Sequence, residues 1–70
     1  MIYVRFEAPG VTSWLTRFYF SAPEWRVTEI ADNAHAFESL DAANAALEAF
    51  GPFAKADRAV IRFAEGGPYE

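Results

Sequence analysis

The chain has 70 residues, a formal net charge of −4 and no cysteine, which indicates one small domain and excludes disulfide bonds and thiolate metal sites. Hydrophobic residues make up 53% and aromatic residues 17% of the chain, a composition that excludes a disordered protein. No apolar run reaches the roughly 20 residues that span a bilayer and the first residues lack the features of a signal peptide, so a soluble, cytoplasmic protein is expected.

The first part of the chain predicts strands. Residues 2–7 alternate, with Ile2, Val4 and Phe6 on one side, which is typical of a half-buried strand. Residues 8–10, Ala-Pro-Gly, are a turn signal. A second strand is predicted over residues 14–20, paired with the first through a loop of several residues. Residues 25–28 predict a short third strand, and residues 29–38, which lack a clean period, predict an irregular connection.

A single helix is predicted over residues 40–50. Ser39 is a favourable N-cap, and five alanines follow it. An apolar stripe runs along one face at helical spacing, through Leu40, Ala43, Leu47 and Phe50. Gly51 and Pro52 are the expected stop signal. Residues 58–64 then predict a last strand, and residues 66–70 predict a flexible tail.

The order β-β-(β)-α-β predicts an α+β fold. We expect one two-layer domain over residues 1–65, in which a single antiparallel sheet of three to four strands packs against the helix and the last strand lies beside the first. The expected helix-covered face of the sheet consists of Ile2, Val4, Phe6, Phe18, Phe20, Ile61 and Phe63. The expected open face consists of Tyr3, Arg5, Leu15, Arg17, Tyr19, Val60 and Arg62.

The sequence contains little that favours catalysis. His35 is the only histidine, and Asp32 and Ser39 lie three residues before and four residues after it. This grouping superficially resembles a catalytic triad, but such short-range spacing arises easily by chance and Ser39 already has a capping role. The chain has no pattern of metal ligands and no glycine-rich phosphate loop. We therefore expect a protein that is not an enzyme and that has no metal or cofactor.

Acidic residues are concentrated in the middle of the chain. Residues 27–54 contain no Lys or Arg but five carboxylates, Glu29, Asp32, Glu38, Asp41 and Glu48. On a helix, Asp41 and Glu48 would lie about 20° apart around the axis and roughly 10 Å apart along it. One interpretation is a solvated helix face. The other is a partner-binding surface that engages a basic groove by charge complementarity and imitates nucleic-acid phosphates.

Two alternatives rest on the sheet. Aromatic and arginine side chains interleave on its expected open face, and Tyr3, Arg5, Arg17, Tyr19 and Arg62 are typical of a single-stranded nucleic-acid platform or of a protein interface. The negative net charge argues against nucleic-acid binding. The other alternative is a self-associating regulator or antitoxin, a homodimer formed through a sheet edge or an open sheet face.

Two segments carry a resemblance that covers roughly residues 1–50. They are Trp14-Leu15-Thr16 and the passage Ala34-His35-Ala36-Phe37-Glu38-Ser39-Leu40-Asp41-Ala42-Ala43. In layout the chain resembles small proteins of bacteriophages and other mobile elements, and in size and charge it is similar to anti-CRISPR proteins. This resemblance implies stoichiometric binding to a Cas subunit of a host complex, a type I CRISPR–Cas surveillance complex, over its DNA-recognition surface. It assigns no functional residue by motif.

Overall fold

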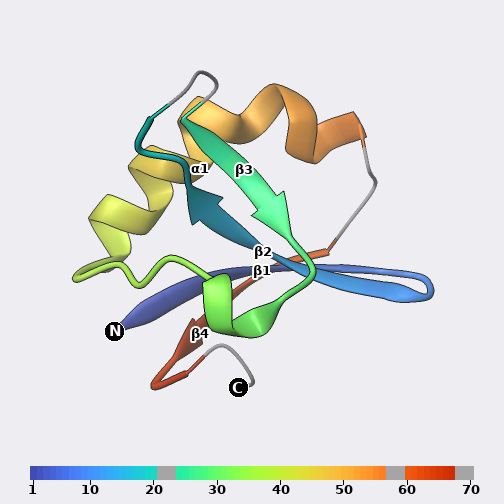
Figure 1. Cartoon of the computed structure of the whole chain (residues 1–70), viewed down its shortest axis with the longest axis horizontal. Helices are drawn as coiled ribbons and strands as arrows, with labels where there is room; N and C mark the ends of the chain where they lie inside the picture. Colours follow the sequence, from blue (N-terminus) through green and yellow to red (C-terminus); the bar gives the residue numbers. More distant parts are fainter. Residues whose placement is uncertain (21–23, 57–59, 68–70) are drawn as a thin grey trace.

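The computed structural model describes residues 1–20, 24–56 and 60–67. In this part of the chain a four-stranded antiparallel sheet has the strand order β3-β2-β1-β4 and packs against one α-helix (Figure 1). The predicted α+β fold is therefore confirmed, including the position of the last strand beside the first. The elements are β1 (Ile2–Ala8), β2 (Val11–Arg17), β3 (Trp25–Thr28), the 3₁₀ helix η1 (Ala31–Asn33), α1 (Leu40–Ala56) and β4 (Val60–Glu65).

The first hairpin is tighter than the sequence predicts. Ala8 pairs directly with Val11, so the loop contains only Pro9 and Gly10. Gly10 has a φ of 81°, a conformation that glycine adopts without steric cost. Because pairing resumes at once, β2 begins three residues earlier than predicted and also ends three residues earlier, at Arg17. Residues 18–20, predicted as strand, lie beyond it.

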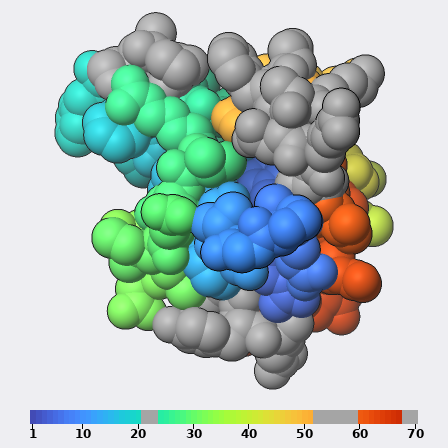
Figure 2. All heavy atoms as spheres, turned by 90° about the vertical axis from the view of Figure 1, so that its right-hand side faces the viewer, coloured from blue at the N-terminus to red at the C-terminus, as the bar shows by residue number. Residues whose placement is uncertain are grey.

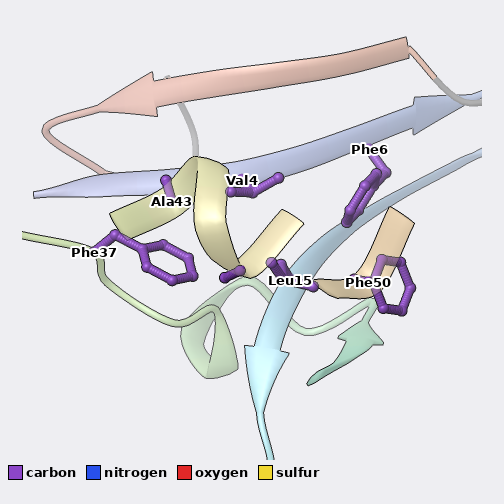
Figure 3. Packing of buried hydrophobic residues seen from close by; sticks show 7 residues of the cluster. Val4, Phe6, Leu15, Phe37, Ala43 and Phe50 are labelled. Carbon is purple, nitrogen blue, oxygen red and sulfur yellow. The ribbon is translucent and has the colours of Figure 1, made fainter. Parts of the chain in front are cut away.

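The core lies between α1 and one face of the sheet. Val4 and Phe6 of β1 point toward the helix, as their alternation predicts, and are 0% and 4% exposed (Figure 3). The Phe6 ring lies 5.7 Å from the ring of Phe50 in α1, measured between centroids. The buried residues of this cluster are Val4, Phe6, Leu15, Phe37, Ala43, Ala46 and Phe50.

The face assignment of β2 was wrong. Leu15, predicted on the open face, is fully buried in the core cluster, and Phe18 and Phe20, predicted under the helix, are exposed. The cause is the register, in which Arg5 pairs with Trp14. Paired residues share a face, so Trp14 lies with Arg5 on the open face and Leu15 lies with Val4 on the helix side.

The start of α1 follows its local signals. The Ala42 N–H donates to the Ser39 hydroxyl at 3.1 Å, so Ser39 caps the helix as predicted. The buried stripe is shifted from the predicted one: Leu40 is 49% exposed, while Ala46 joins Ala43 and Phe50 in the core. Leu40 is the first residue of the helix and precedes the turns that carry the buried residues.

The end of α1 contradicts the predicted stop. The helix continues through Gly51 and Pro52 to Ala56, giving 17 residues. Gly51 does not have the positive φ of a helix-ending glycine, so it acts as an ordinary helical residue. Pro52 removes one backbone donor but does not prevent helical geometry on both sides of it, and proline within a helix usually produces a kink.

The connection after β3 contains structure that the sequence did not indicate. Residues 35–37 lie between the diverging ends of β1 and β2: the His35 N–H donates to the Leu15 carbonyl at 3.0 Å, and Phe37 exchanges two backbone hydrogen bonds with Ile2 at 2.7 and 2.8 Å. These bonds place the Phe37 side chain in the core. The predicted irregular connection is thus part of the sheet layer.

The last strand pairs with β1 along its whole length, from Ile2↔Glu65 to Glu7↔Val60. Ile61 and Phe63 face the helix side, as predicted, but each remains 37% exposed. Residues 58 and 59 of the predicted strand and residues 68–70 of the predicted tail lie outside the described residues. The Gly66 N–H donates to the Met1 carbonyl at 3.1 Å. No helix in the described part of the chain is long and apolar enough to cross a membrane.

Candidate functional site

Three of the five predicted carboxylates follow the start of α1. Glu38 precedes the cap residue, Asp41 lies in the first turn, and Glu48 lies two turns later. All three are exposed, and Asp41 and Glu48 lie on the side of the helix opposite the buried stripe of Ala43, Ala46 and Phe50. Glu38, Asp41 and Glu48 are called the acidic helix surface below.

The other two carboxylates lie elsewhere. Glu29 follows β3 and Asp32 is in η1, and both are exposed. The Thr16 hydroxyl donates to the Asn33 carbonyl at 2.8 Å, and Thr16 shares the open sheet face with Trp14, so η1 lies on the side of the sheet away from α1. Figure 1 shows η1 at the lower end of the sheet. The structure therefore gathers three of the predicted residues and separates them from Glu29 and Asp32.

On the open sheet face a carboxylate lies beside the arginines of β1 and β4. Glu7 lies between two arginines, with its Oε1 3.1 Å from the Arg5 Nε and its Oε2 accepting a hydrogen bond from the Arg62 Nε at 2.9 Å. The hydrogen bond from Arg62 is the main cause that lowers the pKa of Glu7, and it outweighs the opposing effect of desolvation. In contrast, none of the carboxylates of the acidic helix surface forms a salt bridge with a described side chain.

The Tyr/Arg platform considered from sequence is divided by the structure. Tyr3, Arg5 and Arg62 share the open face through the pairings of β1 with β4. Arg17 and Tyr19 lie at the far end of the β2–β3 hairpin, where Arg17 pairs with Trp25. A nucleic-acid strand tracking along one sheet face would therefore not meet all five side chains.

That hairpin end presents three consecutive exposed aromatic residues. Phe18, Tyr19 and Phe20 are 46%, 65% and 97% exposed and are called the aromatic hairpin end below. Figure 2 shows the cyan segment around residue 20 protruding at the upper left of the molecule. Sequence reasoning missed this feature by assigning these residues to a strand, although three aromatics in a row do not alternate in polarity as a half-buried strand does.

Contacts at the base hold this hairpin end in place. The Phe18 N–H donates to the Glu24 carbonyl at 2.6 Å and closes the hairpin. The Arg17 guanidinium forms a salt bridge with Glu24 and lies 4.8 Å from the centroid of the Tyr19 ring. The Arg26 guanidinium lies 4.1 Å from the centroid of the Phe18 ring. The arginines here are engaged with a carboxylate or a ring, so the exposed surface is mainly aromatic.

A chain of ring contacts connects the aromatic hairpin end to the start of α1. Arg17 lies 5.6 Å from the Trp25 ring centroid, and Trp25 lies 5.5 Å from the Phe37 ring centroid. Phe37 immediately precedes Glu38 in the chain. Ring contacts thus run from the base of the aromatic hairpin end to Phe37, the residue before the acidic helix surface in the chain.

His35 belongs to this packing and not to a triad. Its ring makes edge contacts with Trp25 and Phe37, at centroid distances of 5.4 and 4.7 Å. Burial, and secondarily the charge of Arg17, lowers the pKa of His35. Among the described residues no hydrogen bond joins His35 to Asp32 or Ser39, and the Ser39 hydroxyl caps α1.

The described residues offer few groups for metal binding or acid–base chemistry. They contain no cluster of three or more His, Asp or Glu side chains that could hold a metal ion. A shallow hollow of about 690 Å³ lies between the β1–β2 hairpin and the end of β3, and Glu29 is the one ionisable residue in its described lining. Comparison with protein families found no match, and comparisons with curated proteins and with solved structures found none either.

Proposed function

We propose that this protein is a non-enzymatic inhibitor that binds a basic, nucleic-acid-binding surface of a host protein complex. The observation that carries the proposal is the separation of charge. The carboxylates of the acidic helix surface are exposed and unpaired among the described side chains, whereas Arg5, Arg17 and Arg62 each lie beside a carboxylate. Such a surface complements a basic groove and accelerates association with it.

The aromatic hairpin end supplies the apolar part of this interface. Charge complementarity contributes mainly to association rate and specificity, while buried aromatic anchors carry much of the affinity of protein complexes. Phe20 is almost fully exposed, and the residues beneath it are held by the Phe18–Glu24 hydrogen bond and by Arg17. Because its base is held in this way, the hairpin end loses less conformational entropy on binding than an unrestrained loop would.

The first partner to test is a type I CRISPR–Cas surveillance complex, because the chain resembles anti-CRISPR proteins in size, charge and layout. Binding of purified protein to the purified complex is measured by biolayer interferometry, and inhibition is measured as protection of phage from CRISPR immunity. We expect stoichiometric binding that weakens as salt concentration rises, since the acidic helix surface is exposed to screening.

The decisive variant changes Glu38, Asp41 and Glu48 to Lys. Each exposed charge alone contributes about 0–1 kcal/mol, but reversing three of them toward a basic groove makes the surface repulsive, so binding falls by well over tenfold. The matched control changes Glu29, Asp32 and Glu65 to Lys, which alters the net charge equally at other exposed positions. Equal loss in both variants, or undiminished binding by the first, refutes the role of the acidic helix surface.

The apolar contact has its own test. Phe20→Ala removes the most exposed aromatic side chain, and truncation of an interface hot spot costs about 2 kcal/mol or more, which is roughly a 30-fold loss of affinity. Val11→Ala, at an exposed apolar position in the other hairpin, is the control and leaves binding unchanged. A Phe20→Ala protein that binds as tightly as the parent excludes the aromatic hairpin end from the interface.

A further inference from the structure

In the described part of the chain β4 forms one edge of the sheet. β4 pairs with β1 on one side, and on the other side it has no strand partner among the described residues. Its six residues, Val60–Glu65, include neither lysine nor proline, which commonly protect edge strands. The opposite edge is β3, which has only four residues. Unpaired backbone N–H and C=O groups along β4 make another β-strand its natural partner.

The side chains of β4 add an apolar component to this edge. Ile61 and Phe63 face the same side of the sheet as Val4 and Phe6, yet each is 37% exposed and neither belongs to the buried core cluster. The apolar face of the sheet thus continues past the core to the edge. Figure 2 shows β4, in orange, at the margin of the molecule beside β1.

We propose that β4 pairs antiparallel with β4 of a second copy, giving a two-fold symmetric dimer with a continuous sheet across both subunits. The two-fold axis passes beside Arg62. Ile61 of each copy therefore lies opposite Phe63 of the other. This register places apolar side chains against each other on the helix side and brings both helices to the same face of the sheet.

Charge is compatible with this register. Arg62 lies opposite its own copy, a like-charge pair that is unfavourable by itself. In each subunit Arg62 donates to Glu7 at 2.9 Å, and this carboxylate, which also lies beside Arg5, offsets part of the Arg62 charge. The self-complementary apolar pairs, Ile61 with Phe63 twice over, favour a second copy over an unrelated strand. The dimer is independent of the proposed inhibitory function and leaves the acidic helix surface free.

The test is the oligomeric state of the full chain, measured by sedimentation equilibrium from 5 to 500 µM. We expect the parent protein to approach twice its 7.8 kDa mass at the high end of this range. Ile61→Lys places a charge in the seam and should weaken association at least tenfold. Val27→Lys makes the same kind of change at an exposed position on the opposite edge and should leave association unchanged.

Hydrogen exchange on the parent protein keeps the proposal testable if Ile61→Lys fails to fold. Amides of β4 should exchange at least tenfold more slowly at 500 µM than at 5 µM, while amides of β3 keep the same rate. A parent protein that stays monomeric throughout, a folded Ile61→Lys protein that still associates, or concentration-dependent protection in β3 instead of β4 would each overturn the proposal.

Discussion

Replacing Leu15 by alanine tests the register of β1 and β2, which places this side chain in the core. Leu15 is 0% exposed and lies in the core cluster between β1 and α1. Truncation of a fully buried leucine costs about 2–5 kcal/mol, from lost transfer free energy and the cavity that remains. A 70-residue domain has a total stability of roughly 4–10 kcal/mol, so this variant should lose a large part of it.

The matched control is Leu40→Ala, the same chemical change at a side chain that is 49% exposed. Surface substitutions of this kind usually change stability by less than about 0.5 kcal/mol. Both variants are unfolded in urea, with the fluorescence of Trp14 and Trp25 as one probe and far-ultraviolet circular dichroism as the other. If Leu15→Ala is too unstable to fold, Leu15→Val, which removes one methylene, should still lose about 1 kcal/mol.

The order of the stability losses in Leu15→Ala and Leu40→Ala distinguishes the observed register from the predicted one. The alternation predicted from sequence would place Leu15 on the open face and Leu40 in the buried stripe, and it would reverse the order of the two losses. A Leu15→Ala protein within 0.5 kcal/mol of Leu40→Ala would therefore refute the register in which Arg5 pairs with Trp14.

Three further predictions concern local features. Gly10→Ala should lower the free energy of unfolding in urea melts by about 1–2 kcal/mol, because φ at this position is 81°. Gly51→Ala lies inside the helix with open space around the added Cβ and should instead raise the free energy of unfolding by about 0.5–1 kcal/mol. A loss of stability in Gly51→Ala would contradict a helix that passes through Gly51. Ser39→Ala should cost about 1 kcal/mol and Ser39→Asp should retain the cap; equal thermal midpoints for all three proteins would show that the cap contributes nothing. Because the pKa of His35 is lowered in the folded protein, the unfolded chain is protonated first as the pH falls, so stability should be full above about pH 6.5 and should decrease as the pH drops toward 5. Urea midpoints measured over this pH range should vary in the parent and stay constant in His35→Gln. A constant midpoint in the parent would contradict the lowered pKa.

Some features of the candidate site could be predicted from the sequence, and others depend on the tertiary structure. The exposure of Glu38, Asp41 and Glu48 followed from helix periodicity and from the absence of cations nearby in the chain. The separation of Asp32 from them did not, because it depends on η1 contacting β2 through the hydrogen bond from Thr16 to Asn33. The exposure of Phe20 could not be predicted from the sequence either. Aromatic residues have high strand propensity, and only the position of the hairpin end leaves this side chain in solvent.

Local signals alone determined the strands at residues 2–7 and 25–28, the turn at Gly10 and the capped start of α1, because alternation, positive φ and side-chain capping act over a few neighbouring residues. The tertiary structure decided the rest. Which residues of β2 face the helix depends on the pairing with β1, and the burial of Phe37 depends on Ile2, 35 positions earlier in the chain. Likewise, α1 continues through Gly51 and Pro52, where local stop signals predict an end. Register and burial are set by contacts between distant segments, and a one-residue shift in pairing reverses the face of every side chain in a strand.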